Sequence, residues 1–107
     1  MKLWVDDARP APYGYRTARS VNEAKETIKT YEIMRRVSGG KRYYIIELID
    51  IDHDAGDYAK DGGDYIRLLD WLEATGRNYP IRIHSMNPVG VQNMRAIIQR
   101  NGWTEVK

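Results

Sequence analysis

The 107-residue sequence contains no cysteine, which excludes a disulfide framework, a cysteine-ligated zinc site and a thiol nucleophile. Long apolar runs are also missing: the longest has four residues, as in 43–46, whereas a membrane-spanning helix needs roughly 20. An acidic pair, Asp6 and Asp7, comes too early for a secretory signal peptide. We therefore expect a cytoplasmic protein with a single domain over residues 1–107, without membrane association and without a DNA-binding motif.

Charge is distributed unevenly along the chain, although the formal net charge is only +2. Six of the nine aspartates lie within residues 50–64, and two more are the adjacent Asp6 and Asp7. Residues 8–44 are basic, with nine Lys or Arg against three Glu. Clustered carboxylates repel one another, so they indicate either a bound cation or a solvated acidic loop. The basic remainder favours an anionic ligand held through a metal ion.

Short apolar segments alternate with amphipathic ones along the whole sequence. We expect strands at residues 2–5, 15–18, 43–51, 81–84 and 103–106. One helix begins after a capping box at Ser20 and ends at Gly39, a second runs from Tyr65 to Gly76, and a third from Asn87 to Gly102. The first helix should bury Val21, Ala24, Ile28, Tyr31 and Met34. This alternation predicts a small three-layer α/β fold: a parallel sheet with right-handed crossovers and helices on both faces.

In a parallel sheet of this kind, ligands bind outside the carboxyl ends of the strands. Three of the expected strands end in residues able to do chemistry: Asp6-Asp7, Asp52-His53-Asp54 and His84-Ser85. Carboxylates from two strand ends suit Mg²⁺ or a similar divalent ion. We expect Asp6 or Asp7 to act with Asp52 as ligands, with Asp54 or a backbone carbonyl as a further one. The alternative is that the acidic pair caps a turn.

The spacing Asp50-x-Asp52-x-Asp54 also begins like a calcium-binding EF-hand loop. Its sixth position is Ala55 instead of glycine, its twelfth is Asp61 instead of glutamate, and a strand precedes it where an EF-hand has a helix. The spacing therefore gives little support to an EF-hand.

His53 and His84 are the only histidines, and both follow expected strands. Imidazole titrates near neutral pH, so the pair can divide the work of general base and general acid. The alternative for each is a hydrogen-bonded structural role.

An anion site is expected between the strand at 81–84 and the helix that follows. Free amides and the positive end of the helix dipole face such a loop. Ser85 and Asn87 add side-chain donors, and Gly90 allows a ligand to approach the backbone; alternatively, Asn87 serves only as the helix cap. Arg9 either pairs with a phosphate or neutralises Asp6.

An acidic pair after the first strand, Asp52 after the central strand and Ser85 after the next resemble the receiver domains of response regulators. That resemblance implies a flavodoxin-like fold in which Asp6 and Asp7 bind Mg²⁺, Asp52 accepts a phosphoryl group and the Ser85 hydroxyl contacts it. Two features depart from the pattern. Receivers carry a lysine at the end of the last strand, where this chain has only Lys107 without a cis-proline partner. In this sequence, the segments that would correspond to the first and last helices of a receiver are shortened or missing.

A divergent group, the cyclic-phosphate processing receiver domains, is a closer resemblance. The segments that resemble its signatures are Leu3-Trp4-Val5-Asp6-Asp7-x-Arg9-x-x-Pro12, Asp52-His53-Asp54 followed by Gly56, and Ile81-Arg82-Ile83-His84-Ser85-x-Asn87-Pro88-Val89-Gly90-x-x-Asn93-Met94. The resemblance covers most of the chain. It implies a small phage or bacterial protein that acts on 2′,3′-cyclic phosphate ends of RNA or on cyclic nucleotides.

Together, the residues and the resemblance predict metal-dependent binding and hydrolysis of a cyclic phosphate, with Mg²⁺ or Mn²⁺ as cofactor. The expected partner is a phosphate-containing small molecule or an RNA end. Two alternatives remain open at this point. The domain can act without catalysis, either as a switch that is phosphorylated on Asp52 or as a sensor that binds a cyclic nucleotide. It can also bind nucleic acid through the basic face from Arg16 to Arg42.

Overall fold

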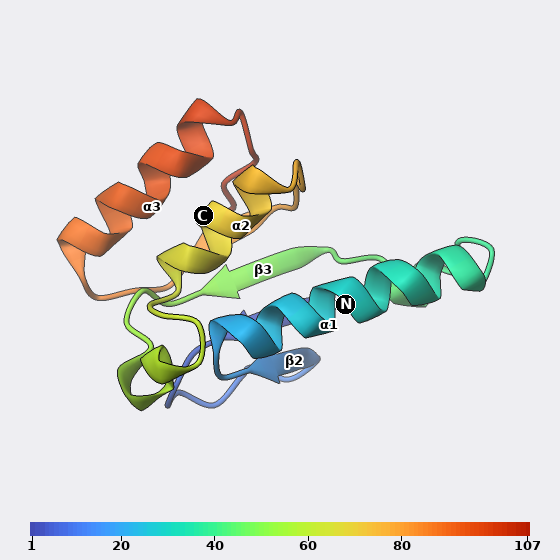
Figure 1. The fold of residues 1–107 in the computed structure, drawn as a ribbon, viewed down its shortest axis with the longest axis horizontal. Helices are drawn as coiled ribbons and strands as arrows, with labels where there is room; N and C mark the ends of the chain where they lie inside the picture. Colours follow the sequence, from blue (N-terminus) through green and yellow to red (C-terminus); the bar gives the residue numbers. More distant parts are fainter.

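Four short parallel strands form a single sheet in the order β2-β1-β3-β4 (Figure 1). The computed structural model describes all residues from 1 to 107. The strands are β1 (Lys2–Val5), β2 (Tyr15–Ala18), β3 (Leu48–Ile51) and β4 (Ile81–Ile83). The α-helices are α1 (Val21–Val37), α2 (Ile66–Ala74) and α3 (Pro88–Arg100), and two 3₁₀ helices are η1 (Arg42–Tyr44) and η2 (Gly56–Lys60). The predicted receiver-like α/β fold with a parallel sheet is confirmed.

One face of the sheet carries the hydrophobic core. Alternate residues of a strand point to the same face, and Leu3, Ile49 and Ile81 are opposite one another across three strands. These residues form one cluster of 18 buried side chains that also includes residues from all three α-helices. The helices therefore cover this face, whereas we expected helices on both.

The absence of helices from the second face follows from the connection between β1 and β2. Because β1 and β2 are parallel, the chain must run back from the carboxyl end of β1 to the amino end of β2. It does so through the loop 6–14 instead of a helix. The loop is attached to the second face where the Trp4 indole Nε1 donates to the Arg9 carbonyl oxygen at 3.0 Å. Trp4 is consequently only 8% exposed without a helix above it.

Two expected strands are shorter in the structure than the sequence suggests. Strand β3 covers only Leu48–Ile51, because β1 begins at Lys2 opposite Leu48 and residues further upstream have no strand beside them. Residues 42–44 form η1 instead, and the rings of Tyr43 and Tyr44 pack against Tyr31 of α1. The segment 103–106 makes only one bridge, between Glu105 and Ile81.

Helix α1 is much longer than the sheet it covers. Ser20 caps it as predicted, accepting the Glu23 amide at 3.0 Å. Its 17 residues span roughly 25 Å, whereas a four-residue strand spans roughly 13 Å. The C-terminal half of α1 therefore projects beyond the strands, as Figure 1 shows. Met34, expected in the core, is exposed there, and Tyr31 is only partly buried. No helix of the structure has both the length and the apolar composition to cross a membrane.

Candidate metal and phosphate site

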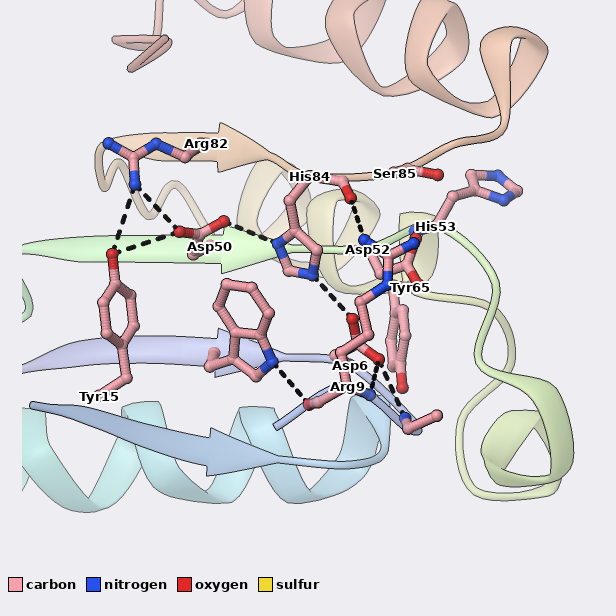
Figure 2. Close-up of polar contacts among 12 residues, drawn as sticks. Asp6, Arg9, Tyr15, Asp50, Asp52, His53, Tyr65, Arg82, His84 and Ser85 are labelled. Atoms are coloured by element: carbon pink, nitrogen blue, oxygen red, sulfur yellow. Dashed lines mark hydrogen bonds and ion pairs between the residues drawn. The ribbon is translucent and has the colours of Figure 1, made fainter. Parts of the chain in front are cut away.

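The carboxyl ends of β1, β3 and β4 bring the predicted residues to one edge of the sheet (Figure 2). Backbone pairing continues past the strands, because the Asp52 amide donates to the Val5 carbonyl oxygen at 2.9 Å and the His84 amide donates to that of Ile51 at 3.0 Å. This pairing fixes where Asp52 and His84 leave the sheet. Residues separated by tens of positions in the sequence therefore share one site.

Three carboxylates at this edge are arranged so that they can hold a metal ion. Oxygen atoms of Asp6, Asp7 and Asp52 all lie within 4.8 Å of one another. Asp6 is fully buried, whereas Asp7 and Asp52 are partly exposed. An all-oxygen donor set that is open to water on one side matches the preference of Mg²⁺ and of Mn²⁺.

Asp7 and Asp52 are the carboxylates with free oxygens. Neither oxygen of Asp7 accepts a hydrogen bond within the protein, and Asp52 accepts one, from the His53 amide to Oδ1 at 2.8 Å. The backbone of η2 lies close against Asp7: a Cβ on Gly56 would be 2.5 Å from Asp7 Oδ2, and Gly56 has a φ of +55°. Glycine at position 56 thus allows the loop to enclose the cluster.

Asp6 is anchored by protein groups on both of its oxygens. Oδ1 accepts the amides of Ala8 and Arg9, each at 2.9 Å, and Oδ2 accepts from His84 Nε2 at 2.9 Å. Burial alone would raise the pKa of Asp6, but these amide and imidazole hydrogen bonds outweigh it and lower that pKa. Asp6 therefore keeps its negative charge while buried, and any metal contact must share an oxygen that is already bonded.

His84 is held between two buried carboxylates. Its Nδ1 lies 2.7 Å from Asp50 Oδ1 and its Nε2 lies 2.9 Å from Asp6 Oδ2. Because an ionised carboxylate can only accept hydrogen bonds, this arrangement favours the imidazolium, in which both nitrogens donate. The ring also stacks on Trp4, with centroids 3.8 Å apart and planes 3° from parallel. Burial lowers the pKa of His84, but the hydrogen bonds to Asp50 and Asp6 raise it by more, so the net shift is upward. Both nitrogens are occupied, which favours a fixed cation over a proton carrier.

Asp50, one of the two partners of His84, was not among the predicted site residues. Asp50 is 1% exposed, and its other oxygen, Oδ2, accepts from Tyr15 and Arg82, each at 3.3 Å. A chain of polar contacts thus runs across the second face of the sheet, from Tyr15 through Asp50 and His84 to Asp6 (Figure 2). One signal was available: Asp50 interrupts an otherwise apolar strand.

His53 differs from His84 in having a free ring nitrogen. Its Nδ1 lies 2.9 Å from Asp54 Oδ1, whereas its Nε2 makes no hydrogen bond within the protein. The ring packs on the first turn of α3, where a Cβ on Gly90 would be 2.5 Å from it. In Figure 2 the two imidazole rings lie on opposite sides of Asp52. Asp54, predicted as a metal ligand, thus bonds to His53 and is not one of the three clustered carboxylates.

The loop before α3 is arranged mainly by its own hydrogen bonds. Asn87 Oδ1 accepts the Gly90 amide at 3.0 Å, so Asn87 acts as the helix cap, the alternative that the sequence left open. Ser85 Oγ accepts the Asn87 amide at 3.1 Å and keeps its own hydroxyl hydrogen for another acceptor. The space that the missing side chain of Gly90 leaves is filled by the His53 ring.

Arg9 and Tyr65 complete the surroundings of the acidic cluster. The Arg9 guanidinium donates to the His84 carbonyl oxygen at 3.2 Å, and it is the amide of Arg9, not its side chain, that bonds to Asp6. Tyr65, which the sequence analysis missed, is fully buried and donates to the Arg19 carbonyl oxygen at 2.6 Å. Burial, followed by the charges of Asp7, Asp6 and Asp52, raises the pKa of Tyr65, so its phenol stays neutral.

Comparison with known proteins supports the resemblance noted in the sequence. No curated protein and no solved structure gives a significant match to the chain. The family model described as the cyclic-phosphate processing receiver domain, however, matches residues 1–100, which include every residue of the candidate site. The chain therefore belongs to the family of cyclic-phosphate processing receiver domains.

Proposed function

We propose that the protein hydrolyses a cyclic phosphodiester at the acidic edge of its sheet, in a reaction that requires Mg²⁺ or Mn²⁺. The substrate is a 2′,3′-cyclic phosphate at an RNA end or a cyclic nucleotide. The observation that carries this proposal is the combination of free oxygens on Asp7 and Asp52 with the free Nε2 of the adjacent His53. Membership of a cyclic-phosphate processing family supports the choice of substrate class.

Asp7 and Asp52 are the proposed principal metal ligands, and Asp6 orients the cluster from its buried position. A divalent ion bound there would polarise the phosphoryl oxygens and offset their negative charge. Arg9 and the hydroxyl of Ser85 lie at the same edge, and we assign them to the remaining phosphate oxygens.

His53 is the residue we assign to proton transfer. In the reaction a water oxygen forms a bond to phosphorus, one ring P–O bond breaks, and the leaving oxygen receives a proton. His53 Nε2 takes a proton from the water and returns one to the leaving oxygen, while Asp54 holds Nδ1. We assign His84 a different role from the acid or base expected at first: its imidazolium fixes Asp6 and balances its charge.

The test measures ring opening by the purified protein. Substrates are 2′,3′-cyclic AMP, 3′,5′-cyclic AMP and a short RNA ending in a 2′,3′-cyclic phosphate, each with Mg²⁺, with Mn²⁺ or with EDTA. We expect turnover of one ring class that EDTA abolishes. Asp52→Asn and His53→Gln should each reduce kcat by roughly 10²–10⁴-fold.

Asp57→Asn is the matched control for these variants, because Asp57 is an exposed carboxylate of η2 without a partner in the structure. Its kcat should equal that of the wild type. Turnover that persists in EDTA, or that survives Asp52→Asn, would rule out the proposed metal-dependent hydrolysis.

A switch or sensor without catalysis is the alternative function. The free Oδ2 of Asp52 and the nearby Ser85 suit phosphorylation of Asp52. A phosphorylated receiver also carries a lysine at the end of its last strand. Here the only lysine near the end of the chain is Lys107, and it pairs with Glu105 at 3.2 Å. Incubation with acetyl phosphate followed by mass spectrometry distinguishes these functions. A phosphoryl adduct on the wild type that is missing from Asp52→Asn would favour the switch. Binding of a cyclic nucleotide without product would favour the sensor.

A further inference from the structure

A pocket of about 510 Å³ lies at the amino-terminal edge of the strands, opposite the acidic site. It is the one pocket that the structure contains, and its volume is within the range of small-ligand sites. It forms where the projecting half of α1 and the η1 turn meet the start of β2. Its lining includes three tyrosines and three charged residues: Tyr15, Tyr31, Tyr43, Arg16, Arg42 and Glu47.

Aromatic rings form one side of this pocket. The rings of Tyr31 and Tyr43 are near-parallel, with centroids 6.4 Å apart and planes 26° apart. Tyr44 packs edge-on against both, which holds the pair in place. Tyr43 is nevertheless 72% exposed, so a broad aromatic surface faces the solvent. Buried aromatic residues stabilise a core, whereas an exposed and supported one is available for stacking.

Positive charge without a carboxylate partner accompanies these rings. The Arg16 guanidinium lies 5.8 Å from the centre of the Tyr31 ring, and neither Arg16 nor Arg42 forms an ion pair. Residues 33–46 contain four Lys or Arg and no acidic residue. The carboxylate of Glu47 lies 3.8 Å from the terminal amino group, which offsets its charge. Other arginines, such as Arg77 and Arg95, are matched with glutamates.

We infer that this pocket binds a nucleoside phosphate, with the base stacked on Tyr43 and the phosphate between Arg16 and Arg42. Stacking on tyrosine combined with arginine contacts to phosphate is the usual chemistry for binding unpaired nucleotides. The ligand can be a free nucleotide or one unit of a single-stranded RNA. The inference is independent of the hydrolysis proposed above, because the two sites use different residues at opposite edges of the sheet.

Two binding measurements distinguish the sources of the ligand. Calorimetry follows AMP, and fluorescence anisotropy follows a short fluorescein-labelled oligoadenylate. Both are done in EDTA with the Asp52→Asn variant as the parent protein, so that the acidic edge does not contribute. Binding of the oligonucleotide alone would identify single-stranded RNA, and AMP binding of equal strength would identify the free nucleotide. Either result supports the inference.

Variants within the pocket test the assigned contacts. Tyr43→Ser should weaken binding by roughly fivefold to a hundredfold, while Tyr43→Phe, which keeps the ring, should leave it unchanged. The double variant Arg16→Gln/Arg42→Gln should weaken binding by roughly tenfold or more and reduce its dependence on salt concentration.

The double variant Lys25→Gln/Lys29→Gln is the matched control, since it removes the same charge from a part of α1 outside the pocket. Lys25 lies over Trp71, and Lys29 pairs with Glu26. Equal losses in this control and in the arginine variant would show binding to general positive charge and would overturn the inference. So would full affinity in Tyr43→Ser, or no binding of either probe.

Discussion

The two faces of the sheet use neighbouring residues in opposite ways. Ile49 of β3 points into the core beneath the helices, whereas Asp50, the next residue, points to the second face and bonds to His84 and Arg82. On the apolar face, stability increases gradually with the area removed from water. On the polar face stability depends on complete pairing. A buried charge that loses its partner lowers the free energy of unfolding by more than the intact pair contributes to it. One strand thus follows two different rules.

The largest effect is expected when the pairing on the polar face is broken. Asp50→Ala leaves the His84 imidazolium with one of its two carboxylate partners, so we expect the free energy of unfolding to fall by about 3–5 kcal/mol. Urea denaturation followed by circular dichroism measures this change. Asp50→Asn keeps the shape and a hydrogen-bond acceptor and should lose less. A loss below ~1 kcal/mol for Asp50→Ala would show that the two faces follow the same rule.

A smaller effect is expected on the apolar face. Ile49→Val removes one methylene from a fully buried side chain, which should lower the free energy of unfolding by about 0.5–1.5 kcal/mol. The same urea experiment applies. Because no charged group changes, the loss should be the same at every pH. A loss that varies with pH would mean that the core and the polar network are coupled.

The smallest perturbation changes only protonation, and on the polar face it acts through His84 and Asp6. The pKa of His84 is raised in the folded state, so the stability it contributes is full below pH 6.5, its ordinary value, and is lost as the pH rises through the folded pKa. The pKa of Asp6 is lowered, so its contribution is full above pH 3.8 and is lost as the pH falls through the folded pKa.

Glu32, Glu73 and Glu105, which pair with arginines, also have lowered pKa values, and their contribution is full only above pH 4.5, their ordinary value. We therefore expect the free energy of unfolding in EDTA to be highest between pH 4.5 and pH 6.5 and to decline on both sides. Urea denaturation at a series of pH values below pH 9 measures the profile. His84→Gln should lack the alkaline decline. An undiminished decline in that variant would assign the effect to other groups.

The positions of the acidic residues were predictable from the sequence alone. The pair Asp6-Asp7 and Asp52 directly follow expected strands, and the carboxyl ends of parallel strands meet at one edge. The partner of His84 was not predictable in the same way. It required the register that puts Asp50 opposite Arg82 in β4, and this register depends on tertiary contacts.

The errors in the fold prediction have a similar origin. Tyr43 and Ile45 have high β-propensity, but propensity does not reveal that β1 begins opposite Leu48 and leaves them without a neighbouring strand. Helices were expected on both faces because a helix usually joins two parallel strands. The loop 6–14 shows that a connection with two prolines can return across the sheet without a helix.

The position of β1 at the centre of the sheet has a consequence for the order of folding. Lys2 pairs with Tyr15 on one side and with the distant Leu48 on the other, and no two strands form a hairpin. The β1–β3 and β3–β4 pairs therefore close long loops before they gain contacts, whereas the β1–β2 pair closes only the loop 6–14. The long loops slow folding relative to a domain of the same size that is built from local contacts. During synthesis β1 leaves the ribosome well before β3, and until β3 follows, the second edge of β1 is open to other strands.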